Sequence, residues 1–238
     1  IRAIEWTGVT HATFVPTMLR AMLDDPALIE ADLSSLRVLS YGSAPMPEPL
    51  LREIMAALPH VGFLQSYGMT ELSPVVTILN CDDHLPENWP SGRLRSAGRC
   101  VLFAEIGVVD AQDRLLPPGE PGEIVARGPN VMLGYWNRPD LTAEALRGGW
   151  MHTGDIGYID ADGYLFVIDR LKDMIISGGE NVYSLEVENA LAAHPAVSQC
   201  AVFGRPHEHW GEAVHAVVTL KPGMEADVAT RQPTIQRA

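Results

Sequence analysis

The sequence predicts an α/β domain followed by a small α+β domain, and three observations predict it. Strand-like apolar runs alternate with helix-like periodic runs over the first third of the chain, as in a parallel sheet with crossover helices. Short strands then follow at close spacing, as in a small β-barrel or a distorted sheet. One amphipathic helix finally precedes two strands. We therefore expect part of an α/β domain at 1–95, a β-barrel-like subdomain at 96–171 and a small, incomplete α+β domain at 172–238.

The first third begins with an amphipathic segment, "IRAIEWTGV", and continues with a β-rich run from Thr10 to Val15. Pro16 suits the first turn of the helix that follows, "PTMLRAML". We expect a buried strand from Leu36 to Tyr41, a helix in "PEPLLREIMAAL" and a second strand in "VGFLQSYGM". Ligands of parallel sheets bind at the carboxyl ends of the strands, where "YGSAP" and "QSYGMTE" lie. The segment "DDHLPEN" reads as a solvated acidic loop.

The remaining elements are shorter. Four strands are expected in "FAEIGVVD", "GEIVARG", "WMHTGDIGYID" and "GYLFVIDR". The helix "SLEVENALAAHP" has Ser184 as its expected N-cap, with Glu186 and Glu188 favouring its first turn. Two strands, "VSQCAVFG" and "EAVHAVVTL", complete the small domain. Residues 225–238 have neither periodicity nor much apolar content, so we expect them to be disordered.

Composition excludes several classes of function. Of the 238 residues, 47% are hydrophobic, and the formal net charge is -13. Such a field repels nucleic-acid phosphates and anionic lipids, which argues against both as partners. No apolar run reaches the length of a transmembrane segment. The three cysteines, Cys81, Cys100 and Cys200, are scattered, which fits a reducing compartment, so we expect a cytoplasmic protein.

Four kinds of side chain gather in short motifs. "QSYGMTE" joins an aromatic ring, a hydroxyl and a carboxylate, and "YGSAP" places small residues at a strand end. Asp155 lies in a glycine-flanked turn, and Arg170 precedes Lys172 at the end of the fourth short strand. An aromatic face suits a nucleobase, and a carboxylate accepts two hydrogen bonds from ribose hydroxyls. An arginine binds ribose or phosphate, and a second carboxylate can hold Mg²⁺. The motifs thus favour a nucleotide as ligand.

Four motifs in this order resemble the adenylate-forming superfamily, which includes acyl-CoA synthetases, peptide-synthetase adenylation domains and beetle luciferases. They are "YGMTE", "VMLGYWNRPDLT", "HTGDIGYIDADGYLFVIDR" and "MIISGGENVYSLEVE". Each is weak alone, but jointly they are very specific, and the resemblance extends to about Gly223. "YGMTE" and "GGENVY" favour the acyl-CoA synthetase branch.

The resemblance implies a role for each motif. Tyr67 would stack on adenine, Thr70 would bond the α-phosphate and Glu71 would ligate Mg²⁺, so Thr70 and Glu71 are the expected catalytic residues. Asp155 would bind ribose, Arg170 ribose or phosphate, and Lys172 would be a hinge between domains. "GSAP" would contact the edge of adenine, and the two glycines of "GGEN" would line the pantetheine tunnel. The expected contact residues are Gly42, Ser43, Ala44, Pro45, Ser66, Tyr67, Gly68, Met69, Thr70, Asp155, Val167, Arg170, Lys172, Gly178, Gly179 and Glu180.

The implied activity is that of an AMP-forming acid-thiol ligase. A fatty or aryl carboxylic acid would react with ATP, with Mg²⁺ as cofactor, to give an acyl-adenylate, and CoA would then displace AMP. Two alternatives stay open: an adenylation domain that loads a carrier protein, and a catalytically dead nucleotide-binding remnant. The complete enzyme is a possible homodimer. The sequence does not name the acid.

Two parts of the family pattern are not found in the sequence. The family's Ser/Thr/Gly-rich phosphate loop, which ends in Pro-Lys-Gly, has no counterpart in the 238 residues. The family also has a lysine near its C-terminus that contacts the carboxylate, whereas "EADVATRQPTIQRA" contains none. We therefore expect the chain to be an internal or C-terminal fragment of an enzyme, and to be inactive alone.

Overall fold

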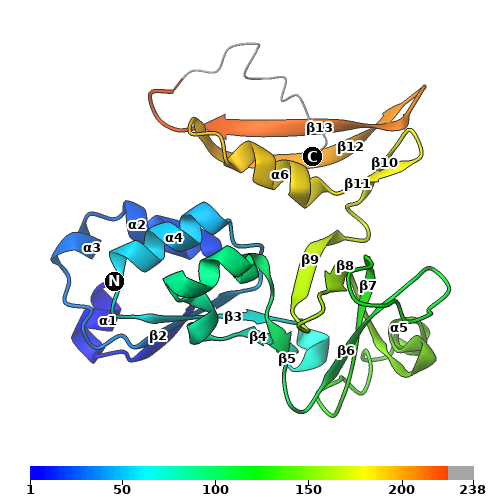
Figure 1. Ribbon diagram of the computed structural model, residues 1–238, viewed down its shortest axis with the longest axis horizontal. Coiled ribbons are helices and arrows are strands. Elements are labelled where there is room, and N and C mark those ends of the chain that lie inside the picture. Colours follow the sequence, from blue (N-terminus) through cyan, green and yellow to red (C-terminus); the bar gives the residue numbers. More distant parts are fainter. Residues whose placement is uncertain (225–238) are drawn as a thin grey trace. The chain divides into compact units, whose positions relative to one another are not determined.

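The computed structural model describes residues 1–224 and divides the chain into two units, Ile1–Val167 and Ile168–Ala238 (Figure 1). Each unit is described by itself. The expectation of disorder at 225–238 lies outside the described residues.

The first unit begins with the elements of a five-stranded sheet. Its helices and strands are α1 (Arg2–Thr7), β1 (His11–Phe14), α2 (Pro16–Asp24), α3 (Ala27–Glu30), β2 (Val38–Gly42), α4 (Glu48–Ala57), β3 (Gly62–Tyr67), β4 (Thr77–Leu79) and β5 (Arg99–Cys100). Short 3₁₀ helices connect the last of these: η1 (Thr70–Leu72), η2 (Cys81–His84), η3 (Pro86–Ser91) and η4 (Arg93–Arg95).

The predicted parallel sheet is confirmed for β1, β2 and β3, which pair in that order. Pro16 starts α2 as expected, and α2 and α4 lie together over one face of the sheet (Figure 1). The core under them contains Leu19, Leu39, Leu51 and Ile54, each fully buried. The helical spacing of apolar residues in α2 and α4 therefore decides which helix face covers the sheet.

The sequence did not reveal that the sheet is mixed. Strand β4 pairs antiparallel with β3, and β5 pairs antiparallel with β4. The segment between β3 and β4 contains only η1, and a parallel return needs a crossover connection of about a dozen residues or more. The short connection therefore dictates an antiparallel strand.

The reading of "DDHLPEN" as a solvated acidic loop holds for Asp82 and Glu87, which are exposed, but not for His84. The segment belongs to η2 and η3, and His84 within it is only 2% exposed. The Nδ1 atom of His84 lies 2.8 Å from the Asn80 carbonyl oxygen, and its Nε2 lies 2.9 Å from the hydroxyl of buried Tyr41. Asp83 accepts a hydrogen bond from Tyr164 at 2.7 Å. The buried imidazole of His84 therefore connects this segment to Tyr41 of β2.

A second sheet completes the first unit, and its last strand ends within the second unit. Its strands are β6 (Glu105–Val109), β7 (Gly122–Arg127), β8 (Met151–Ile159) and β9 (Leu165–Arg170), with α5 (Pro139–Ala145) and η5 (Arg147–Gly149) between β7 and β8. They pair in the order β6-β7-β8-β9. Within residues 1–224 no pairing joins β6 to β9, so the expected β-barrel-like subdomain is an open sheet and that part of the prediction was wrong. A four-stranded sheet is too narrow to close around packed side chains.

The second unit is a four-stranded sheet with one helix. Its elements after β9 are β10 (Ile175–Ser177), β11 (Glu180–Val182), α6 (Ser184–Ala192), β12 (Val197–His207) and β13 (Gly211–Leu220), and the strand order is β11-β10-β13-β12. In the described part of the chain, no helix has the length and apolar content of a membrane span.

The expectation that Ser184 caps α6 was wrong. The N-cap residue is Tyr183, and the Ser184 hydroxyl is buried and donates to Asp169 at 3.0 Å. The Asp169 carboxylate also accepts the Leu185 backbone N–H at 3.4 Å. A carboxylate from another segment therefore stabilises the positive end of the helix, which is the role a local cap would have had.

We predict that the burial of His84 makes the free energy of unfolding decrease as the pH is lowered. Burial lowers the pKa of His84 below its usual value, so the unfolded chain binds the proton more tightly. Stability is therefore complete above about pH 6.5, the ordinary histidine pKa, and declines as pH falls towards the lower folded-state pKa. Urea unfolding from pH 5 to 8 measures this slope, and His84→Gln should flatten it. His11→Gln, at an exposed histidine, is the matched control. An unchanged slope in His84→Gln would contradict the assignment.

Candidate functional site

The motifs "YGSAP" and "QSYGMTE" lie at the adjacent ends of two parallel strands. Gly42 ends β2 and pairs with Ser66 of β3. A Cβ at Gly42 would lie 2.3 Å from the Ser66 carbonyl oxygen, so only glycine allows this pairing. Ser43 then adopts a left-handed conformation with φ of 64°, and Ser43, Ala44 and Pro45 are exposed. The chain thus turns sharply at the carboxyl edge of the sheet and leaves three small residues open to solvent.

Tyr67 lies where the two sheets of the first unit meet. Its ring packs against a cluster that includes Leu72 and Met151, and also against a second cluster that includes Ile124 and Leu165. Its hydroxyl donates to Oδ2 of Asp155 at 2.7 Å. Val167 packs against the second cluster as well. The fold therefore brings together three residues singled out from the sequence, namely Tyr67, Asp155 and Val167.

Asp155 lies in an interruption of the pairing between β7 and β8. Glu123 pairs with Ile156 and Val125 pairs with His152, so residues 153–155 all lie opposite Ile124. Such a bulge bends the strand and redirects a side chain, and bulges are common beside active sites. Gly154 adopts φ of 71°, which favours glycine. The bulge directs Asp155 towards Tyr67 of the neighbouring sheet.

The side chain of Thr153 fastens the bulge to β7. Its hydroxyl donates to the Ile124 carbonyl oxygen at 2.7 Å and lies 3.1 Å from the Asp155 backbone nitrogen, whose N–H it accepts. A threonine hydroxyl can donate one bond and accept another, so one side chain replaces two missing contacts of the sheet.

Thr70 and Glu71 follow the end of β3, in η1. Thr70 is exposed, and Glu71 is half-buried. The Tyr135 hydroxyl donates to Oε1 of Glu71 at 2.7 Å, and the Met132 N–H donates to the Glu71 carbonyl oxygen at 2.8 Å. The hydrogen bond to the carboxylate raises the pKa of Tyr135 to about 12. A Cβ at Gly68 would lie 2.1 Å from the Pro74 carbonyl oxygen, so the turn before η1 requires glycine.

A single carboxylate fits Mg²⁺ only together with other oxygens. Among residues 1–224 no group of three histidine, cysteine, aspartate or glutamate side chains is arranged to hold a metal ion. Mg²⁺ in phosphate sites is commonly held by one or two carboxylates and by the substrate's phosphate oxygens. Glu71 fits that second kind of site, and it would hold the ion with the nucleotide.

The remaining predicted residues belong to the second unit. Arg170 and Lys172 are exposed, and the Arg170 carbonyl oxygen accepts the Asp173 N–H at 3.0 Å, which closes a turn. Gly178 and Gly179, with φ of 61° and 83°, turn the chain from β10 into β11.

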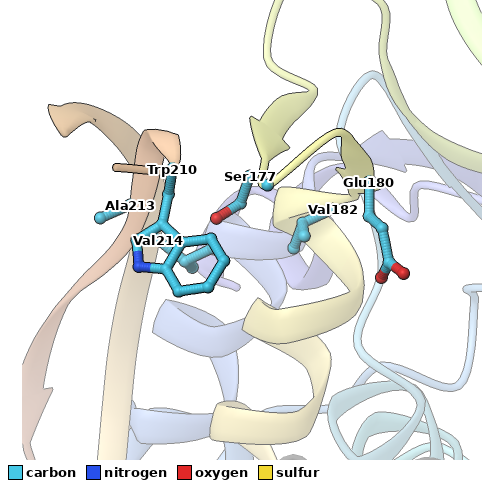
Figure 2. A pocket seen from close by; sticks show the side chains of 7 residues that line it. Ser177, Glu180, Val182, Trp210, Ala213 and Val214 are labelled. Atoms are coloured by element: carbon cyan, nitrogen blue, oxygen red, sulfur yellow. The ribbon is translucent and has the colours of Figure 1, made fainter. Parts of the chain in front are cut away.

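Gly178 and Glu180 also line an open pocket of about 480 Å³. Figure 2 shows Trp210 and Val214 on one side of it and Val182 and Glu180 on the other. The Gly178 N–H donates to the Trp210 carbonyl oxygen at 2.8 Å, which fixes one edge of the pocket. Apolar and charged groups therefore face the same space.

Two residues of the site were not found from the sequence. Tyr135 reaches Glu71 from a position 64 residues away, and Glu123 contacts the bulge that carries Asp155. "GY" within "VMLGYWNRPDLT" and "GE" at the start of β7 mark both residues. Neither dipeptide indicates which distant residue its side chain contacts.

Comparison with known proteins supports the resemblance. Residues 1–136 match the family model described as AMP-binding enzyme, and residues 186–238 match the AMP-binding enzyme C-terminal domain. A feruloyl-CoA synthase from Amycolatopsis sp is 47% identical over 95% of this chain and 45% of its own length. The medium/long-chain-fatty-acid–CoA ligase FadD8 from Mycobacterium tuberculosis is 41% identical over 100% of this chain and 42% of its own.

Solved structures give the same result. Amide bond synthetase McbA from Marinactinospora thermotolerans superposes with a TM-score of 0.87 at 38% identity, covering 95% of this chain and 45% of its own. ATP-bound MatB from Rhodopseudomonas palustris superposes with a TM-score of 0.85 at 35% identity. The match covers 96% of this chain and 44% of the MatB chain. The chain thus spans less than half the length of the relatives it matches.

The match of residues 1–136 extends over more than half of the sequence, and the solved relatives share its fold. The chain belongs to the AMP-binding enzyme family.

Proposed function

We propose that the chain carries nucleotide contacts of an ATP-dependent ligase that joins a carboxylic acid to the thiol of CoA. The observation that carries this proposal is the 2.7 Å hydrogen bond between Tyr67 and Asp155. It brings a ring suited to a base and a carboxylate suited to ribose hydroxyls to the same point, beside the ends of parallel strands. Ser66, Gly68, Met69 and the "GSAP" turn would form the edge of the adenine site.

The first half-reaction needs positive charge because two anions meet. The acid's carboxylate oxygen attacks the α-phosphorus of ATP, and pyrophosphate leaves with the electron pair of the broken P–O bond. The exposed Thr70 hydroxyl is suited to donate to an α-phosphate oxygen as charge develops there. Mg²⁺, when bound, neutralises phosphate charge. The role of Glu71 is to hold that ion on the protein side.

The second half-reaction requires an acceptor thiol. The thiolate attacks the acyl carbon of the adenylate, and AMP leaves. The pocket lined by Gly178, Glu180 and Trp210 supports a role of the second unit in binding that acceptor. We further propose that Arg170 contacts ribose or phosphate and that Lys172 is a hinge, because both lie just past the boundary between the two units.

The relatives support a fatty or aryl acid as substrate. Their names include feruloyl-CoA synthase, indoleacetate–CoA ligase and a medium/long-chain-fatty-acid–CoA ligase. A second candidate acceptor is a carrier protein, because one relative, 44% identical, is named fatty acid–[acyl-carrier-protein] ligase ScoC.

ATP–pyrophosphate exchange with a panel of fatty and aryl acids tests the ligase directly, in the full-length protein in which this sequence occurs. Exchange followed by thioester formation with CoA supports the first proposal, whereas transfer only to a phosphopantetheinylated carrier protein supports the second. Nucleotide binding without exchange for any acid indicates a dead remnant and contradicts both. For the 238 residues alone we expect no acyl-CoA, since they contain no phosphate loop ending in Pro-Lys-Gly.

We predict that Asp155→Ala weakens AMP binding at least about a hundredfold. Two charge-assisted hydrogen bonds to ribose would be lost, each worth about 1.5–3 kcal/mol. Titration calorimetry measures the affinity, and 2′,3′-dideoxy-AMP should bind the variant and the parent protein equally. Asp162→Ala, which removes an exposed carboxylate that pairs with Arg93 outside the proposed site, is the matched control and should stay within about threefold. Unchanged AMP affinity in Asp155→Ala would refute the ribose role.

Glu71→Gln should leave nucleotide binding intact without Mg²⁺ but slow adenylate formation. The amide keeps the shape of the side chain and loses the charge that Mg²⁺ requires. Pyrophosphate exchange as a function of Mg²⁺ concentration measures the effect, and the midpoint should move to higher Mg²⁺. Tyr135→Phe, which frees the Glu71 carboxylate of its hydrogen bond, is a control that keeps the charge. A wild-type rate for Glu71→Gln at limiting Mg²⁺ would exclude a ligand role.

Lys172→Pro should separate the two half-reactions. Proline fixes φ near −65° and removes a backbone donor, so it restricts a hinge. We expect adenylation to be largely retained and thioester formation to be lost, as measured by exchange and by acyl-CoA production on the same preparation. Lys172→Ala, which keeps a mobile backbone, should retain both. Equal loss of both reactions in Lys172→Pro would argue against a hinge.

A further inference from the structure

The bulge that carries Asp155 is held by one carboxylate from the neighbouring strand. Gly154 lies within the bulge, where regular pairing with β7 is interrupted. Its N–H donates instead to Oε1 of Glu123 at 3.1 Å. A buried backbone donor without a partner is costly, so this side chain replaces a missing bond of the sheet.

The other oxygen of the same carboxylate holds the residue before the bulge. Oε2 of Glu123 lies 2.8 Å from Nδ1 of His152 and accepts from the guanidinium of Arg147 at 3.0 Å. The side chains of Glu123 and His152 are only 13% and 4% exposed. Glu123 thus binds the start and the middle of the bulge at once, with Arg147 as its counter-charge.

The geometry suits a carboxylate at this position, because both of its oxygens have partners. Glu123 accepts hydrogen bonds from Gly154 and Arg147, and its Oε2 also lies 2.8 Å from Nδ1 of His152. A glutamine offers one acceptor oxygen and would turn an NH₂ group towards the other donors. Loss of the charge would also leave Arg147 only Asp113 as a carboxylate partner, at 3.1 Å. A neutral side chain therefore cannot make all the contacts that hold residues 152–154.

We infer that Glu123 is a positioning residue for Asp155, which it aims through the bulge without touching the nucleotide. This inference rests on the proposed function, in which Asp155 binds ribose. Two tethers act on the bulge: Glu123 holds residues 152 and 154, and Thr153 holds the Ile124 carbonyl oxygen. When the first tether is lost, the backbone that carries Asp155 is held less firmly, so its carboxylate, although still bonded to Tyr67, is aimed less precisely and the hydrogen bonds to the ribose hydroxyls weaken.

The test is the affinity of the full-length protein for AMP relative to 2′,3′-dideoxy-AMP. Glu123→Gln should weaken AMP binding about tenfold, as expected for weakened charge-assisted hydrogen bonds, and leave dideoxy-AMP binding unchanged. In the Asp155→Ala background it should have no further effect, because the two residues act as a unit. Glu105→Gln is the matched control: it removes a glutamate on the adjacent strand that pairs with an arginine, Arg127, away from the bulge.

The outcomes separate this inference from the proposed function. If Asp155→Ala does not reduce the preference for AMP over dideoxy-AMP, the ribose role itself fails. If Asp155→Ala reduces this preference but Glu123→Gln keeps the preference of the parent protein, only the positioning role fails. If Glu123→Gln weakens the binding of AMP and of dideoxy-AMP equally, Glu123 has a general structural role, and the positioning role is again refuted. Should Glu123→Gln not fold, Glu123→Asp, which keeps the charge but shortens the reach, is judged by the same ratio.

Discussion

The hydrogen bond between Tyr67 and Asp155 joins the two sheets of the first unit at the point where both leave regular pairing. Tyr67 is the last residue of β3, and Asp155 lies in the bulge of β8. The ring of Tyr67 also packs against apolar clusters from both sheets, so burial and polar geometry position the same side chain. A hydrogen bond to a charged group contributes about 1.5–3 kcal/mol, a large share of the net stability of a domain. The two sheets cannot shift against each other without breaking this contact.

The residues of the candidate site lie where backbone hydrogen bonding is incomplete. Strand ends, the turn after Gly42 and the bulge at residues 153–155 all leave peptide groups without a sheet partner. Some of these groups are satisfied from within the protein, by Glu123 and Thr153. Peptide groups and side chains at such places can serve a ligand, because the regular ladder does not use them. Peptide groups at an interruption of the sheet therefore need side chains as partners, and those that remain can bind a ligand.

An acidic chain that is to bind a polyanion must compensate charge locally. The formal net charge is -13, and several arginines, among them Arg20, Arg93, Arg127 and Arg147, are paired with carboxylates. These arginines connect helices, loops and strands at the protein surface. In the proposed function, charge compensation at phosphate would depend on a bound cation and on hydroxyl donors such as that of Thr70. The carboxylate proposed to hold Mg²⁺, that of Glu71, is consistent with this need.

The sequence by itself determined the parallel β1-β2-β3 core, the helices that cover it, the placement of two motifs at strand ends and the family. These features follow from local rules: apolar periodicity, the fixed φ of Pro16 and motif spacing. Only the tertiary structure decided that β4 pairs antiparallel with β3 and β5 antiparallel with β4. It likewise decided that the second sheet stays open and that Asp169 occupies the place expected for a Ser184 cap. It also decided that Tyr67 meets Asp155, 88 residues away, and that Glu123 holds the bulge. A local pattern states which residues are apolar or can turn, whereas long-range pairing depends on the register and packing of elements that no short stretch encodes.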